Sequence, residues 1–170
     1  MLDTMGQYYY PIILDANGKI VVWMNGQTYN EGLKLMEHSY LDNTFVNTFE
    51  FALSQEGPHY KSRVVWAGDY ADKEPGKETN LYEQCNEYNL IRPQEKDASK
   101  YRYIVNHTKN LYVDKSKVQS LHPLPLLTAE GNGRGGGDLH EAPSWVGSWA
   151  RDVISVEKMV PEDFEELDMV

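Results

Sequence analysis

The residues best placed to do chemistry lie in a glycine-rich segment that follows a short apolar run. Five of the seven residues from 131 to 137 are glycine. Glycine loses the most conformational freedom on folding, so such a cluster suits positive φ angles or a backbone that lies close against another group. Backbone N–H groups with one arginine can also bind an anion. We therefore predict a binding surface made of Gly131, Asn132, Gly133, Arg134, Gly135, Gly136, Gly137 and Asp138. The alternative is a long loop that only packs against neighbouring strands.

Two familiar phosphate-binding motifs do not fit this segment. A P-loop ends in lysine followed by Ser or Thr, and no such pair closes the segment. Gly131, Gly133 and Gly136 match G-x-G-x-x-G by letter, but Pro143 soon interrupts the helix that this motif requires.

Carboxylates and imidazoles near the predicted strand ends form a second set. Side chains of these types bind hard or borderline cations. Their spacing matches no compact ligand motif, and Asp and His are also common in turns. The weak candidates for a metal site are Asp69, Asp72, His107, Asp138 and His140.

Nucleophilic catalysis is not indicated. Acidic neighbours of Cys85 would raise its thiol pKa, and we expect this side chain to face the core of a helical segment. Ser144 and Ser148 lack the G-x-S-x-G pattern. We therefore name no catalytic residue and expect no cofactor.

Three tryptophans next to glycines are candidates for a recognition surface. A flat ring with one polar N–H binds partners at little entropic cost. Tryptophans are also frequent core residues, and this alternative stays open. The residues are Trp66, which precedes Asp69 and Asp72, and the pair Trp145 and Trp149 around Gly147.

Composition narrows the class of protein. The chain has 170 residues, 41% of them hydrophobic and 12% aromatic, which is enough to fill one core. The net charge of −10 disfavours direct nucleic-acid binding and has two interpretations: ordinary solubility, or an acidic face for a basic partner. The chain has one cysteine, so it has no internal disulfide. It also has no secretion signal and no apolar run near the roughly 18 residues that span a bilayer. We therefore expect a cytoplasmic protein without membrane contact.

The pattern of elements predicts an α+β fold with one compact domain. We expect six or seven short strands in a mostly antiparallel or mixed sheet, with two or three short helices. Asn17-Gly18 between two apolar runs predicts a hairpin, and Asn43 or Thr44 could cap a helix. The predicted strands are 8–14, 20–24, 63–67, 101–106, 111–113, 124–128 and a last strand broken near Arg151 into 144–150 and 152–157. The predicted helices are 31–38 (or a turn), 45–54 and a segment from 79 or 80 to 88.

Several motifs resemble a widespread family of small uncharacterised bacterial and phage-borne proteins. They are MGQYY at 5–9, GLKLMEHSY at 32–40, RVVWAGDYAD at 63–72, YIVNHT at 103–108, HPLPLLTAEGNGRGGGD at 122–138 and VGSWARD at 146–152. The resemblance covers nearly the whole chain and brings no activity with it. It implies that residues 1–4 are an N-terminal extension; we expect one domain over 5–160 and an acidic tail over 161–170.

Two functions follow as hypotheses. The first is a non-catalytic protein that binds a partner protein stoichiometrically, such as an acidic inhibitor or modulator of a host nucleic-acid enzyme or defence system. The second is a small nucleotide- or phosphate-binding protein or metal-dependent enzyme that uses the glycine-rich residues 131–137. The sequence does not indicate an oligomeric state.

Overall fold

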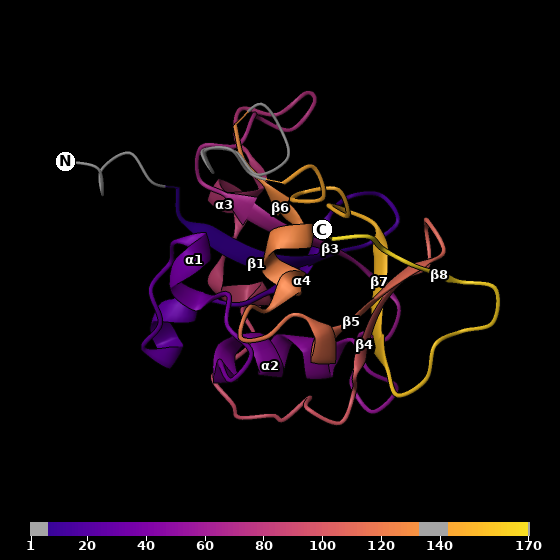
Figure 1. Ribbon diagram of the computed structural model, residues 1–170. Coiled ribbons are helices and arrows are strands. Elements are labelled where there is room, and N and C mark those ends of the chain that lie inside the picture. The colour runs from indigo at the N-terminus through magenta and orange to yellow at the C-terminus, as the bar shows by residue number, and fades with distance from the viewer. Residues whose placement is uncertain (1–6, 133–142, 170) are drawn as a thin grey trace.

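A computed structural model describes residues 7–132 and 143–169 of the chain, and its centre is a single mixed sheet (Figure 1). The strands follow the order β2-β1-β3-β7-β4-β5-β8, and β6 pairs with β3 off this path. The strands are β1 (Tyr9–Leu14), β2 (Ile20–Trp23), β3 (Ser62–Gly68), β4 (Tyr103–Asn106), β5 (Leu111–Asp114), β6 (Ala129–Glu130), β7 (Val153–Glu157) and β8 (Glu165–Glu166). The predicted α+β fold is confirmed.

Short helices connect the strands. The α-helices are α1 (Leu35–His38), α2 (Thr44–Ala52), α3 (Leu81–Gln84) and α4 (Pro123–Leu127). In the described part of the chain, three 3-10 helices accompany them: η2 (Gly26–Tyr29), η3 (Glu87–Asn89) and η4 (Lys115–Lys117). Among the described residues no helix is long and apolar enough to cross a bilayer.

The two central strands β1 and β3 are buried on both faces. Alternate residues of β3 belong to different core clusters: Val64 and Trp66 to a large one, Val65 and Ala67 to a smaller one. Side chains alternate across a strand, so one apolar run supplies both clusters. Residues of α2 and α4 pack into the large cluster and Leu81 of α3 into the small one, which gives helices on both faces of the sheet.

Local turn and cap chemistry produced the elements that the sequence predicted best. The β1–β2 hairpin turns at Gly18, whose φ is +80°. Helix α2 begins where the Asn43 side chain accepts a hydrogen bond from the Val46 amide at 3.2 Å. An N-cap of this kind satisfies an amide that has no partner within the helix.

The predicted strand over 124–128 is wrong, because this segment forms helix α4. The His122 side chain caps the helix by accepting from the Leu124 amide at 3.2 Å, and Pro123 and Pro125 occupy the first turn. Proline costs little there, since the first amides of a helix have no internal acceptor. All five helix residues are buried, so the run shows no polar face.

Two further expectations need correction. Residues 144–150 form turns and not a strand, with Gly147 at a φ of +77°. The predicted helix from 79 or 80 to 88 ends at Gln84, because Cys85 is extended at φ −65° and ψ 132°, and a separate 3-10 turn follows.

Near the C-terminus, β8 pairs in parallel with β5, so the segment expected to be an acidic tail adds an edge strand.

Candidate functional site

The glycine-rich segment starts from the middle of the sheet. Strand β6 runs parallel to β3, with Ala129 opposite Trp66 and Glu130 opposite Ala67. Parallel strands leave a sheet at the same end, so Asp69 and Gly131 emerge together there. Gly131 is buried, and exposed Asn132 accepts a hydrogen bond from Gln7 Nε2 at 2.9 Å. The other predicted residues, Gly133, Arg134, Gly135, Gly136, Gly137 and Asp138, lie outside the described residues.

Close packing surrounds this starting point. A Cβ atom on Gly68 would lie 2.5 Å from Gln7 Oε1 and 3.3 Å from the Glu130 carbonyl oxygen. A side chain at this position would displace the Gln7 amide and push the Glu130 backbone by a few tenths of an ångström, so the end of β3 favours glycine. On the other side of the strand end, Asp69 accepts a hydrogen bond from the Tyr8 amide at 2.9 Å.

Arg151 binds two carboxylates beside β6, a cluster that we call the Arg151 clamp. Its guanidinium donates to Glu130 at 2.6 Å and to Glu74 at 2.7 and 2.8 Å. These hydrogen bonds, first those to Glu74, raise the pKa of Arg151 further above its usual range. Sequence reasoning missed the clamp, because Arg151 and Glu74 are 77 residues apart.

Two of the three candidate tryptophans are core residues. Trp66 and Trp149 are both 0% exposed, so they cannot form the rim of a recognition surface in this structure. Trp66 Nε1 donates to His38 Nε2 at 2.9 Å, and His38 Nδ1 in turn donates to the Gly32 carbonyl at 2.9 Å. Burial lowers the pKa of His38, which favours this neutral tautomer.

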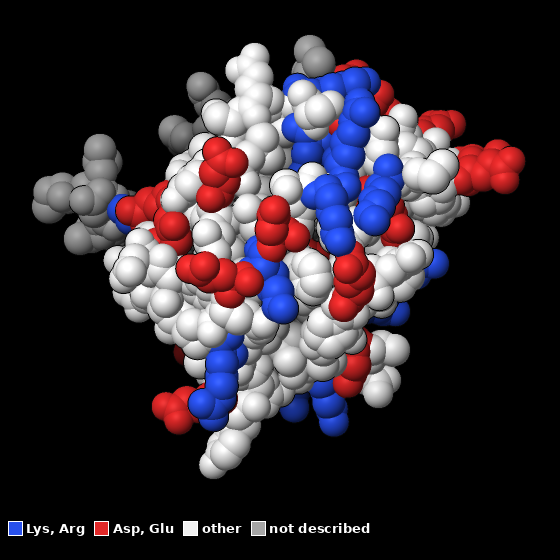
Figure 2. Space-filling model, turned by 90° about the horizontal axis from the view of Figure 1, so that it is seen from below, with Lys and Arg blue, Asp and Glu red and all other residues white. Residues whose placement is uncertain are grey.

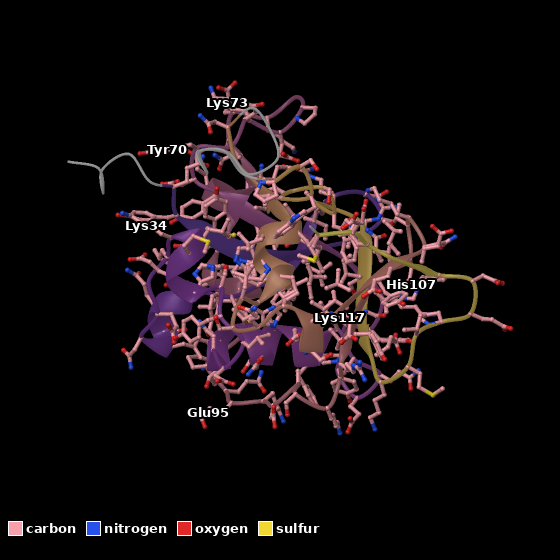
Figure 3. The ribbon with its side chains drawn as sticks, in the orientation of Figure 1. Lys34, Tyr70, Lys73, Glu95, His107 and Lys117 are labelled. Atoms are coloured by element: carbon pink, nitrogen blue, oxygen red, sulfur yellow. The ribbon has the colours of Figure 1, made fainter. Side chains whose placement is uncertain are left out.

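The metal candidates do not converge within the described part of the chain. There, no three His, Cys, Asp or Glu side chains form a group that could hold a metal ion. Asp69 and Asp72 flank Tyr70, and Figure 3 shows Tyr70 and His107 at well-separated places on the molecule. Asp138 and His140 lie outside the described residues.

His107 instead belongs to a chain of hydrogen bonds along β7. The Ser155 hydroxyl donates its hydrogen to Glu157 at 2.5 Å, and Tyr60 donates to the same carboxylate at 2.7 Å. Since the Ser155 hydrogen is used in this way, His107 Nε2 is the donor to Ser155 Oγ at 2.8 Å. A serine nucleophile needs the opposite direction, with histidine accepting the hydroxyl proton. Ser155 is also 0% exposed, so this chain is structural.

A buried charge cluster under α2, the Glu50 triad, was also absent from the sequence predictions. Glu50 lies 2.8 Å from Lys115 Nζ and 2.9 Å from His122 Nε2. Burial disfavours the Glu50 carboxylate, but its interactions with His122 and with the Lys115 ammonium group outweigh burial and lower the Glu50 pKa. Since Glu50 and His122 are 0% exposed, the triad holds α2, η4 and α4 together.

Cys85 is half-buried and packs against the smaller core cluster. Burial raises the pKa of its thiol to about 12. The thiol pKa is raised, as we expected, but the cause is burial of the thiol and not its acidic neighbours.

The third tryptophan, Trp145, lines a groove of about 560 Å³. We call it the Trp145 groove; the end of β5, η4 and the segment that includes β8 form its walls. Its apolar residues include Val118, Leu121, Trp145, Leu167 and Met169, and its charged residues are Asp114, Lys117, Glu166 and Asp168. Trp145 packs against the large core while remaining partly exposed, which suits a binding anchor.

A backbone hydrogen bond and two ion pairs connect the walls of this groove. Leu167 N donates to the Tyr112 carbonyl at 2.9 Å, and Lys117 lies 2.9 Å from Glu166. Asp114 accepts from Arg102 at 2.7 and 2.9 Å, and these hydrogen bonds lower the Asp114 pKa.

The surface is not uniformly acidic despite the net charge of −10. Figure 2 shows basic side chains gathered over one part of the lower face, with acidic side chains beside them. The sequence pattern did not reveal this gathering, because its members need not be neighbours along the chain.

Comparisons with protein-family models, with curated proteins and with solved structures find no match for this chain.

Proposed function

We propose that the chain is a binding protein that acts stoichiometrically on a partner protein, with the Trp145 groove as the docking site. The observation that carries the proposal is the groove of about 560 Å³ that has Trp145 beside five other apolar side chains. A tryptophan in a well-packed pocket is typical of residues that dominate binding energy at interfaces.

The properties of the groove support a protein ligand. Its apolar residues suit an aliphatic or aromatic side chain of the partner, and its charged rim suits polar contacts around that side chain. The wall that includes β8 is fixed by backbone pairing with β5 and by the hydrogen bond from Leu167 N to the Tyr112 carbonyl, so little ordering is needed on binding.

The net charge supports a basic partner, because an acidic protein attracts one over distance. The resemblance to bacterial and phage-borne proteins agrees with a host protein as the target, such as a nucleic-acid enzyme or a defence protein. The glycine-rich segment starting at Gly131 and Asn132 stays part of the proposed surface.

A comparison of groove variants tests the proposal. The full chain is immobilised as wild type, as Leu121→Lys and as Met159→Lys, and bacterial lysate is passed over each at low and at physiological salt. Met159 is 79% exposed and lies outside the groove, so it is a matched control. We expect the wild type and M159K to retain the same protein and L121K to lose it. Retention by all three variants, or by none, contradicts the proposal.

A further inference from the structure

A second cavity lies between two turns that are far apart in the sequence. It has a volume of about 600 Å³, which falls in the range of small-molecule sites. One wall is the β1–β2 turn and another is the turn around Gly76; residues of α3 and η3, together with Arg151, complete the lining. We call it the lysine–amide cleft, after Lys19, Lys77, Gln84, Asn86 and Asn89.

Both turns are held in shape without a ligand. The Asp15 carboxylate accepts from the Asn17 amide at 2.8 Å and from the Lys19 amide at 3.0 Å. In the second turn, the Lys77 amide donates to the Glu74 carbonyl at 2.9 Å, and the Arg151 clamp holds the Glu74 side chain. A ligand would therefore meet a largely pre-formed site.

The two lysines give the cleft its capacity for an anion. Lys19 and Lys77 are both exposed, and the structure gives neither ammonium group an ion pair with any residue it describes. Arg151, in contrast, forms ion pairs with Glu74 and Glu130, so its charge is already balanced by carboxylates. An ammonium group binds phosphate as a point charge.

The amides add both kinds of hydrogen-bonding group. Gln84 and Asn89 use their NH₂ groups on backbone carbonyls, with distances of 3.3 Å for Gln84 and 3.1 and 3.2 Å for Asn89, which leaves their side-chain oxygens as acceptors. Asn86 uses its oxygen to accept from the Tyr88 amide at 2.9 Å, which leaves its NH₂ group as a donor. Hydroxyl groups both donate and accept, so they match this set.

We propose that the lysine–amide cleft binds a small phosphorylated sugar. Lys19 and Lys77 contact the phosphate, and Gln84, Asn86 and Asn89 bind sugar hydroxyls. The site is separate from the Trp145 groove and does not depend on the proposed function. It also differs from phosphate binding by the glycine-rich segment, because none of residues 131–137 is needed.

The test is isothermal titration calorimetry on the full chain, with ribose 5-phosphate, adenosine 5′-monophosphate, ribose and inorganic phosphate as probes. We expect saturable binding of ribose 5-phosphate, and binding of ribose and of phosphate weaker by about tenfold or more. Adenosine monophosphate separates two sources of the same chemistry: tighter binding assigns the cleft to nucleotides, and weaker binding assigns it to free sugar phosphates.

Three variants locate the site. Lys19→Gln and Lys77→Gln should each weaken ribose 5-phosphate by about tenfold, because each removes a charge-assisted contact. Lys73 lies in the same loop as Lys77 but outside the lining of the cleft, so Lys73→Gln should bind ribose 5-phosphate like the wild type. All three positions are exposed, so the variants should fold. No binding of either phosphorylated probe, equal binding of inorganic phosphate, or unchanged binding by both K19Q and K77Q overturns the proposal.

Discussion

The Glu50 triad and the Arg151 clamp both combine carboxylates with basic side chains, but in opposite ratios. In the triad one carboxylate, Glu50, lies between two basic groups; in the clamp one guanidinium, Arg151, lies between two carboxylates. The triad is sealed, since the Glu50 and His122 side chains are 0% exposed, whereas 26% of the Arg151 side chain is exposed.

Because of this difference in exposure, we assign the Glu50 triad a purely structural role, whereas the Arg151 clamp also shapes a surface. A sealed charge cluster can only hold elements together, and its members depend on one another because water cannot replace a lost partner. The clamp also joins distant segments, but it borders the lysine–amide cleft and so shapes a surface. Removal of a charge should therefore cost more stability in the triad than in the clamp.

The largest effect should come from Glu50→Gln. This change leaves the buried Lys115 ammonium without its counter-charge and weakens the contact with His122 Nε2, and breaking a buried ion pair costs about 3–5 kcal/mol. Urea denaturation measures the free energy of unfolding. The control is Glu56→Gln, whose exposed ion pair with Lys100 should contribute little. If E50Q and E56Q have equal stability, the triad is not structural.

A smaller loss should follow Arg151→Met. Glu74 and Glu130 would lose the hydrogen bonds of the guanidinium, but water can reach the site through the exposed edge, so we expect a loss of about 1–3 kcal/mol. The same urea experiment with Lys117→Met, whose ion pair with Glu166 is exposed on both sides, should give a smaller change. A loss for R151M that exceeds the loss for E50Q would reverse the comparison.

The smallest effect is a difference in pH dependence. The pKa of His38 is lower in the folded protein than in the unfolded chain. Below about pH 6.5 the unfolded chain therefore binds a proton that the folded protein does not, and the free energy of unfolding falls. Glu50 also has a lowered folded pKa, so its contribution is complete above about pH 4.5 and is lost as the pH falls further.

Urea titrations at several pH values separate these two contributions. E50Q should keep the decline that begins near pH 6.5 and show a shallower decline below about pH 4.5. Other carboxylates with lowered pKa, such as Asp114, keep part of the acid dependence in both proteins. An unchanged slope below pH 4.5 in E50Q would show that the Glu50 ion pairs do not couple folding to pH.

Predictions from the sequence succeeded where a few neighbouring residues decide the structure. The hairpin at Gly18 and the cap at Asn43 depend on contacts within three or four residues. The apolar run at 124–128 was misread, because periodicity cannot distinguish a fully buried helix from a buried strand. Trp66, Trp145 and Trp149 have similar sequence surroundings, yet only Trp145 is partly exposed.

The sequence by itself determined the α+β class, the edges of the central strands and the position of the glycine-rich segment. These follow from composition, turn residues and alternation, which act over short distances. Only the tertiary structure decided which charges meet: Glu50 and Lys115 are 65 residues apart, and Lys19 reaches the same cleft as Lys77 across two turns. The physical reason is that ion pairs and cavities depend on distance in space, which strand pairing sets and sequence spacing does not.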